Sequence, residues 1–221
     1  MKYTDLLHYL FDNCDKKFAE FSKSLSNSKY ISIGVKNPVL RSIIKEHKND
    51  DELKLEDFEL GKYLEIDFIY FGLAVTRAKT IDEQLSFIEK NIRNGKSWVL
   101  TDCCQTYLKK CDFETFHKFF LKMYKSKYTY DRRFAYVFAL KFSKSPEILT
   151  IFPLITKNEE YMVMMGQAWF LATAAISFGD EVYNYLSTLN DQILKRKTIS
   201  KMCESYRISD ELKLKVRSLR K

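Results

Sequence analysis

Glycine and proline are scarce in this chain, and their scarcity limits most strongly what it can fold into. The 221 residues include 6 Gly and 3 Pro, fewer than an average soluble protein carries. Tight β-turns depend on these two residues, so a fold with many such turns is disfavoured. Strand-like alternation is weak, apart from the brief Tyr30-Ile31-Ser32-Ile33. We therefore predict an all-α fold whose helices are joined by short connections.

Helix start signals recur at short intervals along the chain. Asn37-Pro38 places a capping residue before a proline suited to the first helical turn. Thr80 to Glu83 has the spacing of a capping box. Ser97 can cap the helix that follows Asn94-Gly95. Further start signals lie at Asp112, Ser145-Pro146 and Ser209. We expect about twelve helices of roughly 10–18 residues, with connections of about 2–5 residues.

The expected helices form pairs, and the pairs recur at about 35–45 residues, the range of HEAT-type units. A stack of such pairs curves and creates a concave surface. We predict a single HEAT-like helical-repeat domain over residues 1–221, an α-solenoid superhelix with a concave basic face. An all-α globule without repeat order is the alternative.

The charge balance favours an anionic partner. Lys and Arg number 37 and Asp and Glu number 29, which gives a net charge of +8 and suggests a polyanion. The longest apolar stretch, residues 168–178, is too short to span a bilayer. The N-terminus lacks the apolar core of a signal peptide. We expect a cytoplasmic monomer with no membrane partner.

The cysteines and histidines show no spacing typical of a metal site. The five cysteines are odd in number and include no CxxC, so neither a disulfide framework nor a zinc site is indicated. We interpret them as buried free thiols in a reducing cytosol. The three histidines lie far apart in the sequence. No metal and no cofactor is predicted.

The segment Trp98-Val99-Leu100-Thr101-Asp102 combines the two side chains most suggestive of chemistry. If residues 97–110 are helical, positions four apart share one face. An indole face attracts positive charge, and a carboxylate stabilises positive charge that develops as a bond breaks. This pairing therefore suits a cationic guest. A core anchor followed by a surface cap is the alternative.

Several segments in order resemble one family. They are Gly34-Val35-Lys36-Asn37-Pro38-Val39-Leu40-Arg41 (a GV-x-x-P-x-L-R element), Trp98 to Asp102 (W-x-x-x-D), Arg132-Arg133-Phe134-Ala135 (RR-x-A), Met164 to Trp169, and Cys203 to Arg207. From about residue 30 to the C-terminus, the chain resembles the DNA alkylation repair (AlkD-like) family of HEAT-repeat DNA glycosylases.

The resemblance implies excision of purines that carry a positive charge after N3 or N7 alkylation, from double-stranded DNA. Asp102 matches the family's catalytic carboxylate. Trp98 and Trp169, the two tryptophans of the chain, match the indoles that enclose the cationic sugar and base. The family is thought to work from the backbone side without a base pocket, whereas other glycosylases extrude the base into one.

Basic residues are expected to hold DNA phosphates. Arg132 and Arg133 are the best candidates, since one of them matches the family's DNA-contacting arginine. Lys36, Arg41 and Lys96 are further candidates, followed by Arg196, Lys197 and Lys201. A solvated surface charge is the alternative for each of these lysines and arginines.

Two departures from the family pattern concern DNA binding. Ala172 stands where active members tend to carry arginine, three residues after the second tryptophan. Residues 22–26 carry no aromatic side chain where one is expected.

The sequence as a whole leaves three functional hypotheses. They are a DNA glycosylase, a non-catalytic DNA-binding protein for bent or branched DNA, and a helical-repeat protein scaffold.

Overall fold

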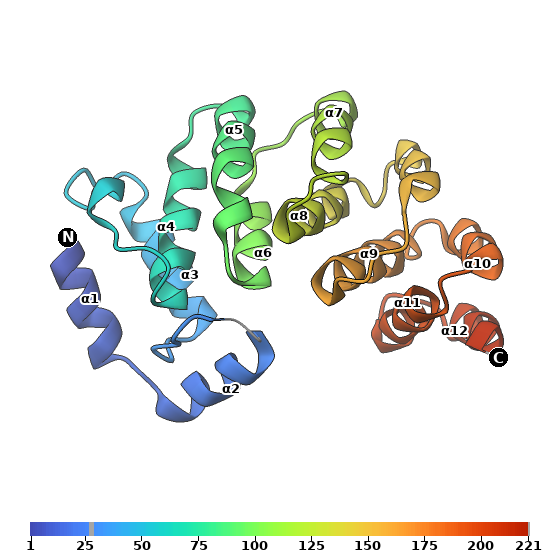
Figure 1. The fold of residues 1–221 in the computed structure, drawn as a ribbon, viewed down its shortest axis with the longest axis horizontal. Coiled ribbons are helices and arrows are strands. Elements are labelled where there is room, and N and C mark those ends of the chain that lie inside the picture. Colours follow the sequence, from blue (N-terminus) through green and yellow to red (C-terminus); the bar gives the residue numbers. More distant parts are fainter. Residues whose placement is uncertain (27–28, 221) are drawn as a thin grey trace. The chain divides into compact units, whose positions relative to one another are not determined.

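The computed structural model describes residues 1–26 and 29–220, and within them the fold is all-α (Figure 1). Twelve α-helices and five 3-10 helices make up the regular structure of these residues. The extended tendency at Tyr30 to Ile33 produces a single isolated parallel bridge between Ile31 and Tyr63 instead of a strand. The predicted all-α class is therefore confirmed.

The chain divides into two compact units, Met1–Lys110 and Cys111–Lys221. The single repeat domain and its concave basic face stay predictions, so each unit is described by itself. Within the described residues, no helix is both long enough and apolar enough to cross a membrane.

The N-terminal unit is built around a buried helix. Its helices are α1 (Tyr3–Asp12), α2 (Lys16–Ser26), α3 (Asn37–His47), η1 (Leu55–Asp57), α4 (Leu64–Arg77), α5 (Ile81–Asn91), η2 (Ile92–Asn94) and α6 (Trp98–Tyr107). Helix α4 packs against α3, α5 and α6, and most of its residues from Leu64 to Val75 are buried. Successive residues of a helix point in all directions around its axis, so burial of nearly all of them shows that neighbouring elements enclose α4.

A buried carboxylate joins α4 to the segment before α3. Glu65 is 2% exposed and accepts hydrogen bonds from Ser32 Oγ at 2.8 Å and from the backbone N–H groups of Ile33 and Gly34, both at 2.9 Å. Gly34 has a φ of +100°, and a Cβ there would lie 2.2 Å from Asp15 O. Glycine is therefore required at the start of the GV element, because both its backbone angle and its surroundings exclude a side chain.

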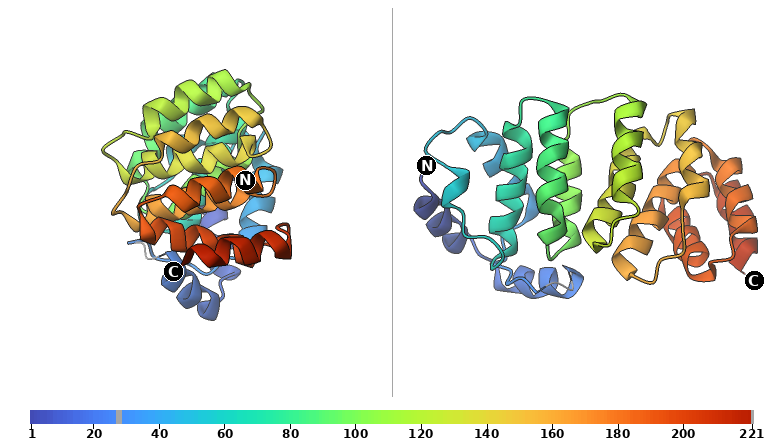
Figure 2. Two further views of the ribbon diagram at one scale, coloured as in Figure 1. Left: turned by 90° about the vertical axis from the view of Figure 1, so that its right-hand side faces the viewer. Right: turned by 45° about the horizontal axis from the view of Figure 1, so that its top comes forward.

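The C-terminal unit is a succession of packed helices. They are α7 (Phe113–Met123), α8 (Thr129–Ala139), η3 (Leu140–Phe142), η4 (Pro146–Leu154), α9 (Tyr161–Ala174), α10 (Gly179–Thr188), α11 (Gln192–Glu204), α12 (Asp210–Arg217) and η5 (Ser218–Arg220). Helix α9 lies between α8 and α11, while α7 packs on α8 and α12 packs on α11 (Figure 2).

The phenylalanines of α7 form part of the core of this unit. Phe116 and Phe120 are fully buried and Phe119 is 8% exposed. The Phe116 ring lies 5.1 Å from that of Phe138 on α8, in an edge-to-face arrangement that aromatic pairs prefer. These rings are therefore unavailable for stacking on nucleobases.

Most of the predicted helix starts are confirmed by their hydrogen bonds. Thr80, Ser97, Asp112 and Ser209 each accept a bond from a backbone N–H in the first turn of the following helix. Helix α3 differs, because it begins at Asn37 with Lys36 as its N-cap, and no side chain caps it. The prediction that Asn37 caps this helix is therefore wrong, because Asn37 is its first residue.

The segment after Ser145 forms the 3-10 helix η4 and not an α-helix. Pro153 lies inside it, and proline both lacks the N–H that an α-helix needs and clashes with the preceding turn. The start signal at Ser145-Pro146 is real, but a second proline seven residues later disfavours an α-helix.

Helix pairs recur at a shorter interval than expected. The second helices of successive pairs are α4, α6, α8, α9 and α11, which begin at Leu64, Trp98, Thr129, Tyr161 and Gln192. Their starts are thus 31 to 34 residues apart, against the expected 35–45. Compact helices of 10 to 14 residues account for the difference.

The cysteines are unpaired, and two of them, Cys103 and Cys104, are buried. Burial raises the pKa of both thiols, which makes them poor nucleophiles. Cys14 is exposed, and Cys111 and Cys203 are partly exposed. The prediction of buried cysteines is therefore wrong for these three residues. Among the described residues, no group of three His, Cys, Asp or Glu side chains could hold a metal ion.

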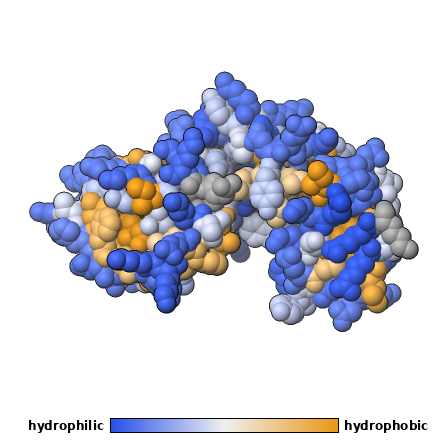
Figure 3. Space-filling model, turned by 60° about the horizontal axis from the view of Figure 1, so that its bottom comes forward, coloured by the Kyte–Doolittle hydropathy of each residue, from blue (hydrophilic) through white to orange (hydrophobic). Residues whose placement is uncertain are grey.

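Apolar side chains also reach the surface of the N-terminal unit, among them Phe11, Phe21 and Leu25, which are 45–56% exposed. This unit occupies the left of Figure 3, where apolar groups lie between hydrophilic ones. Phe21 and Leu25 belong to α2, the helix that reaches the candidate site described next.

Candidate functional site

Helix α6 carries Trp98 and Asp102 on its partly exposed side. Trp98 is the first residue of the helix, directly after the capping Ser97, whose Oγ accepts a bond from Val99 N at 3.3 Å. Trp98 and Asp102 are both half-buried, whereas Leu100 and Cys103 are fully buried. The predicted helix and the shared face of the two side chains are thus confirmed, because residues four apart on a helix are neighbours.

Polar groups surround both side chains. The Trp98 indole Nε1 donates to Leu25 O of α2 at 3.4 Å. The Thr101 hydroxyl lies 3.0 Å from Asp102 Oδ1 and 2.6 Å from Trp98 O, and this side chain is fully buried. A neighbour in the same helix thus contacts the Asp102 carboxylate directly, and the Asp102 residue as a whole is half-buried.

An exposed aromatic side chain was missed in the sequence. Phe21 of α2 is 56% exposed and lies one residue before the segment 22–26, in which no aromatic was found. The side chain of Ser26, the last residue of that segment, lies outside the described residues, as do Asn27 and Ser28. The amphipathic spacing of Phe18, Phe21 and Leu25 was the signal that could have revealed it.

The predicted DNA-binding residues of the N-terminal unit differ in their availability. Lys36 is exposed. Lys96 Nζ donates to Gly61 O at 3.0 Å and lies 5.8 Å from the centre of the Tyr30 ring, so it also holds a loop. Arg41 is half-buried, with its guanidinium carbon 5.9 Å from the centre of the Phe68 ring. Its charge opposes the rise in the pKa of Cys103 that burial causes, which places Arg41 near α6.

The two arginines of the RR-x-A element attach α8 to the start of α9. Arg132 pairs with Glu160, the N-cap of α9, and donates to Ser126 O at 2.7 Å. Arg133 is 5% exposed and donates to Met162 O at 2.9 Å. Both side chains therefore have structural partners within the C-terminal unit, and a DNA contact by either one stays a prediction.

Trp169 is an exposed indole on an otherwise buried part of α9. It is 37% exposed, while Ala168, Phe170 and Leu171 are fully buried. It borders a surface hollow of about 220 Å³, which we name the Trp169 hollow. The residues that line it are Trp169, Ala172, Thr173, Ile176, Lys201, Glu204, Ser205 and Arg207.

The candidate catalytic residues are shared between the two units. Trp98 and Asp102 belong to the N-terminal unit, and Trp169 belongs to the C-terminal unit. All three lie on second helices of pairs, Trp98 and Asp102 on α6 and Trp169 on α9, with α8 between these two helices in the sequence. Their convergence on one substrate stays a prediction.

The positive charge of the chain is concentrated in the C-terminal unit. Residues 1–110 contain 18 Lys and Arg and 17 Asp and Glu, a balance of +1, whereas residues 111–221 contain 19 and 12, a balance of +7. Residues 195–221 alone hold ten basic and three acidic residues. A field of one sign attracts polyanions over distances beyond direct contact, so the charge balance favours polyanion binding by this unit.

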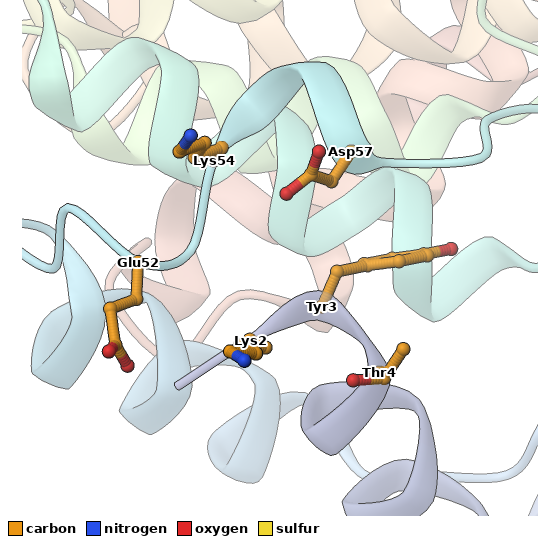
Figure 4. Close-up of a pocket in the computed structure, with 6 residues that line it drawn as sticks. All are labelled: Lys2, Tyr3, Thr4, Glu52, Lys54 and Asp57. Atoms are coloured by element: carbon orange, nitrogen blue, oxygen red, sulfur yellow. The ribbon is translucent and has the colours of Figure 1, made fainter.

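Other hollows carry weaker signals. One of about 420 Å³ lies between the start of α1 and the segment around η1 (Figure 4). Its lining residues are Lys2, Tyr3, Thr4, Glu52, Lys54 and Asp57. This hollow is lined by charges of both signs and by none of the candidate residues. We therefore assign it no role in the predicted chemistry.

Comparison with known proteins agrees with these features. The sequence model of the family described as "DNA alkylation repair enzyme" matches residues 7–205. A solved structure titled "Predicted DNA alkylation repair enzyme from Enterococcus faecalis" superimposes with a TM-score of 0.66 and 15% sequence identity, covering 87% of this chain and 98% of that chain. No curated protein matches this chain.

The family match extends over most of the chain, and it includes both tryptophans and Asp102. The chain belongs to the DNA alkylation repair enzyme family, which confirms the resemblance seen in the sequence and indicates a role in DNA repair. At 15% identity, the solved structure shows only that the helical fold is shared.

Proposed function

We propose that the protein is a DNA glycosylase that removes purines made cationic by N3 or N7 alkylation from double-stranded DNA. The observation that carries the proposal is the pairing of Trp98 and Asp102 on the partly exposed side of α6 in a chain of the DNA alkylation repair family. Trp169, exposed on α9, supplies the second indole.

The reaction breaks one bond and forms another. The bond between C1′ of the sugar and the purine nitrogen breaks, and its electron pair goes to the purine, which leaves neutral because it carried a positive charge. The sugar passes through an oxocarbenium-like state. Water then adds to C1′ and loses a proton, giving a free alkylated base and an abasic site.

Asp102 would stabilise the sugar as it becomes cationic and would orient the attacking water. A carboxylate one helical turn from an indole is well suited to this, since the charge appears only as the bond breaks. The indoles of Trp98 and Trp169 would lie against the cationic sugar and base, because the face of an indole attracts positive charge.

The test is release of methylated purine from an alkylated duplex under single-turnover conditions. We expect wild-type protein to release the base, and Asp102→Asn to slow release by about 10²–10³-fold, the usual cost of removing one preorganised electrostatic group. Asp51→Asn is the matched control, because Asp51 is an exposed loop residue of the same unit. Lack of release by wild-type protein at high concentration would refute the proposal.

A non-catalytic DNA-binding role is the second candidate, and Ala172 favours it. This residue lines the Trp169 hollow at the position where the resemblance leads one to expect arginine. Such a protein would bind duplex DNA with a steep salt dependence and would release no base, so the same assay separates the two roles.

A further inference from the structure

We propose that the Trp169 hollow is a binding site for a DNA backbone phosphate, held by Lys201 and Arg207 beside the Trp169 indole. The proposal rests on DNA being the partner, as in the proposed function, but it does not depend on base excision. It assigns the phosphate contact to two side chains that lie 32 and 38 residues after Trp169 in the sequence.

Two neighbouring helices build the hollow. Helix α9 contributes Trp169, Ala172 and Thr173, and α11 with the segment that follows it contributes Lys201 and Arg207. The small Ala172 side chain leaves the space beside the indole open. The hollow thus combines an aromatic surface with cations on the opposite side.

The two cations suit a phosphate in different ways. Arg207 is exposed, and within the described residues its guanidinium makes no hydrogen bond or ion pair, so its planar set of donors can bind two phosphate oxygens at once. Lys201 is 39% exposed and serves as a more flexible point charge. A backbone phosphate would bind Arg207 without displacing a protein partner, whereas at Lys201 it would compete with the exposed partner Glu204.

Glu204 opposes phosphate binding in the free protein. Its Oε2 lies 3.0 Å from Lys201 Nζ, and its side chain is 62% exposed. It is the one acidic residue among those lining the hollow. An incoming phosphate must compete with this carboxylate for Lys201 and is repelled by it, so removal of its charge should strengthen DNA binding.

The charge around the hollow favours a polyanion over a small anion. One turn before Lys201 on α11, Lys197 Nζ lies 5.6 Å from the centre of the Tyr161 ring on α9. A second pair of cation and aromatic ring thus follows the same two helices. Successive pairs of this kind suit a nucleic-acid strand, in which phosphates alternate with sugars and bases that can lie on aromatic faces.

The experiment measures the affinity for an unmodified, fluorescently labelled duplex by anisotropy over a series of salt concentrations. The slope of log K against log salt is negative, and each lost phosphate contact makes it less steep by about 0.9. We expect Lys201→Gln and Arg207→Gln each to reduce the steepness by about that amount. Lys118→Gln and Arg217→Gln remove the same charge from exposed positions of the same unit outside the hollow and should leave the slope unchanged.

A gain of binding gives a second, independent readout. Glu204→Gln should tighten binding several-fold, whereas Glu114→Gln should not, although Glu114 forms a comparable exposed ion pair with Lys118 at 2.6 Å on α7. Inorganic phosphate at constant ionic strength should compete no better than chloride. Strong competition by phosphate would show a site for a free anion instead.

The proposal is overturned if the Lys201 and Arg207 variants keep the wild-type slope, or if wild-type protein binds no duplex at low salt. Thermal unfolding of each variant checks that folding is intact. Because the duplex carries no lesion, loss of excision in the Asp102 experiment and loss of phosphate binding here are separate results.

Discussion

Gly72 and Gly166 offer a sharp test of the packing, because the same substitution to alanine should have opposite effects at the two positions. Gly72 lies inside α4 and Gly166 inside α9. Alanine in a helix interior is favoured over glycine by about 0.8–1 kcal/mol. The surroundings of the added methyl group therefore decide the sign.

At Gly166 a Cβ would lie 3.5 Å from Arg133 Cγ and 3.7 Å from Tyr136 Cβ, which is ordinary contact. At Gly72 it would lie 2.3 Å from Ile44 Cδ1 and 3.0 Å from Ile44 Cγ1. Ile44 is fully buried and has little room to move. Such overpacking costs about 1–3 kcal/mol, which exceeds the helical gain.

We expect Gly166→Ala to stabilise the protein by about 1 kcal/mol, a rise in melting temperature of about 2–4 °C for a chain of this size. Gly72→Ala should lower the melting temperature. Thermal unfolding followed by circular dichroism measures both. If Gly72→Ala were as stable as wild type, the inferred close contact between α3 and α4 would be wrong. If Gly166→Ala were less stable than wild type, the inferred looser contact between α8 and α9 would be wrong.

Two further predictions concern stability. Burial raises the pKa of Asp67, so the folded state binds this proton more tightly than the unfolded chain does. The free energy of unfolding of the wild type should therefore fall as pH rises from about 4, the usual pKa of Asp, through the raised pKa. Urea unfolding at a series of pH values should show this fall for Asp51→Asn but not for Asp67→Asn. Thr80 Oγ1 accepts a bond from Glu83 N at 3.1 Å, so Thr80→Ala should cost about 1 kcal/mol and Thr80→Ser much less. An unchanged urea midpoint for Thr80→Ala would contradict the cap.

Local chemistry made much of the fold predictable. Thr80, Ser97 and Asp112 cap helices through bonds that reach two or three residues along the chain. Such bonds involve only neighbouring residues, so the sequence signal was enough at these three positions, although the cap predicted at Asn37 does not form. Helix η4 was harder to predict, because its departure from α geometry involves Pro153 as well as the start signal at Pro146.

The candidate site was predictable only where it is local. Trp98 and Asp102 had to share a face once residues 98–107 were helical, and helical geometry fixes that relation without tertiary contacts. The scarcity of Gly and Pro similarly favoured helices over a fold with many tight turns. The sequence by itself therefore determined the all-α class and the pairing on α6.

Only the tertiary structure decided what the basic residues do. Arg133 donates to the backbone carbonyl of Met162 in the first turn of α9, whereas Lys201 and Arg207 lie beside Trp169. In the sequence Arg133, as part of the RR-x-A element, was a stronger candidate for a DNA contact than Lys201, and nothing marked it as an anchor between helices. The burial and the contacts of these side chains depend on how α8, α9 and α11 pack against one another. Packing between segments some 30 residues apart leaves no local sequence pattern, so an arginine that anchors a helix cannot be distinguished in the sequence from one that can bind an anion.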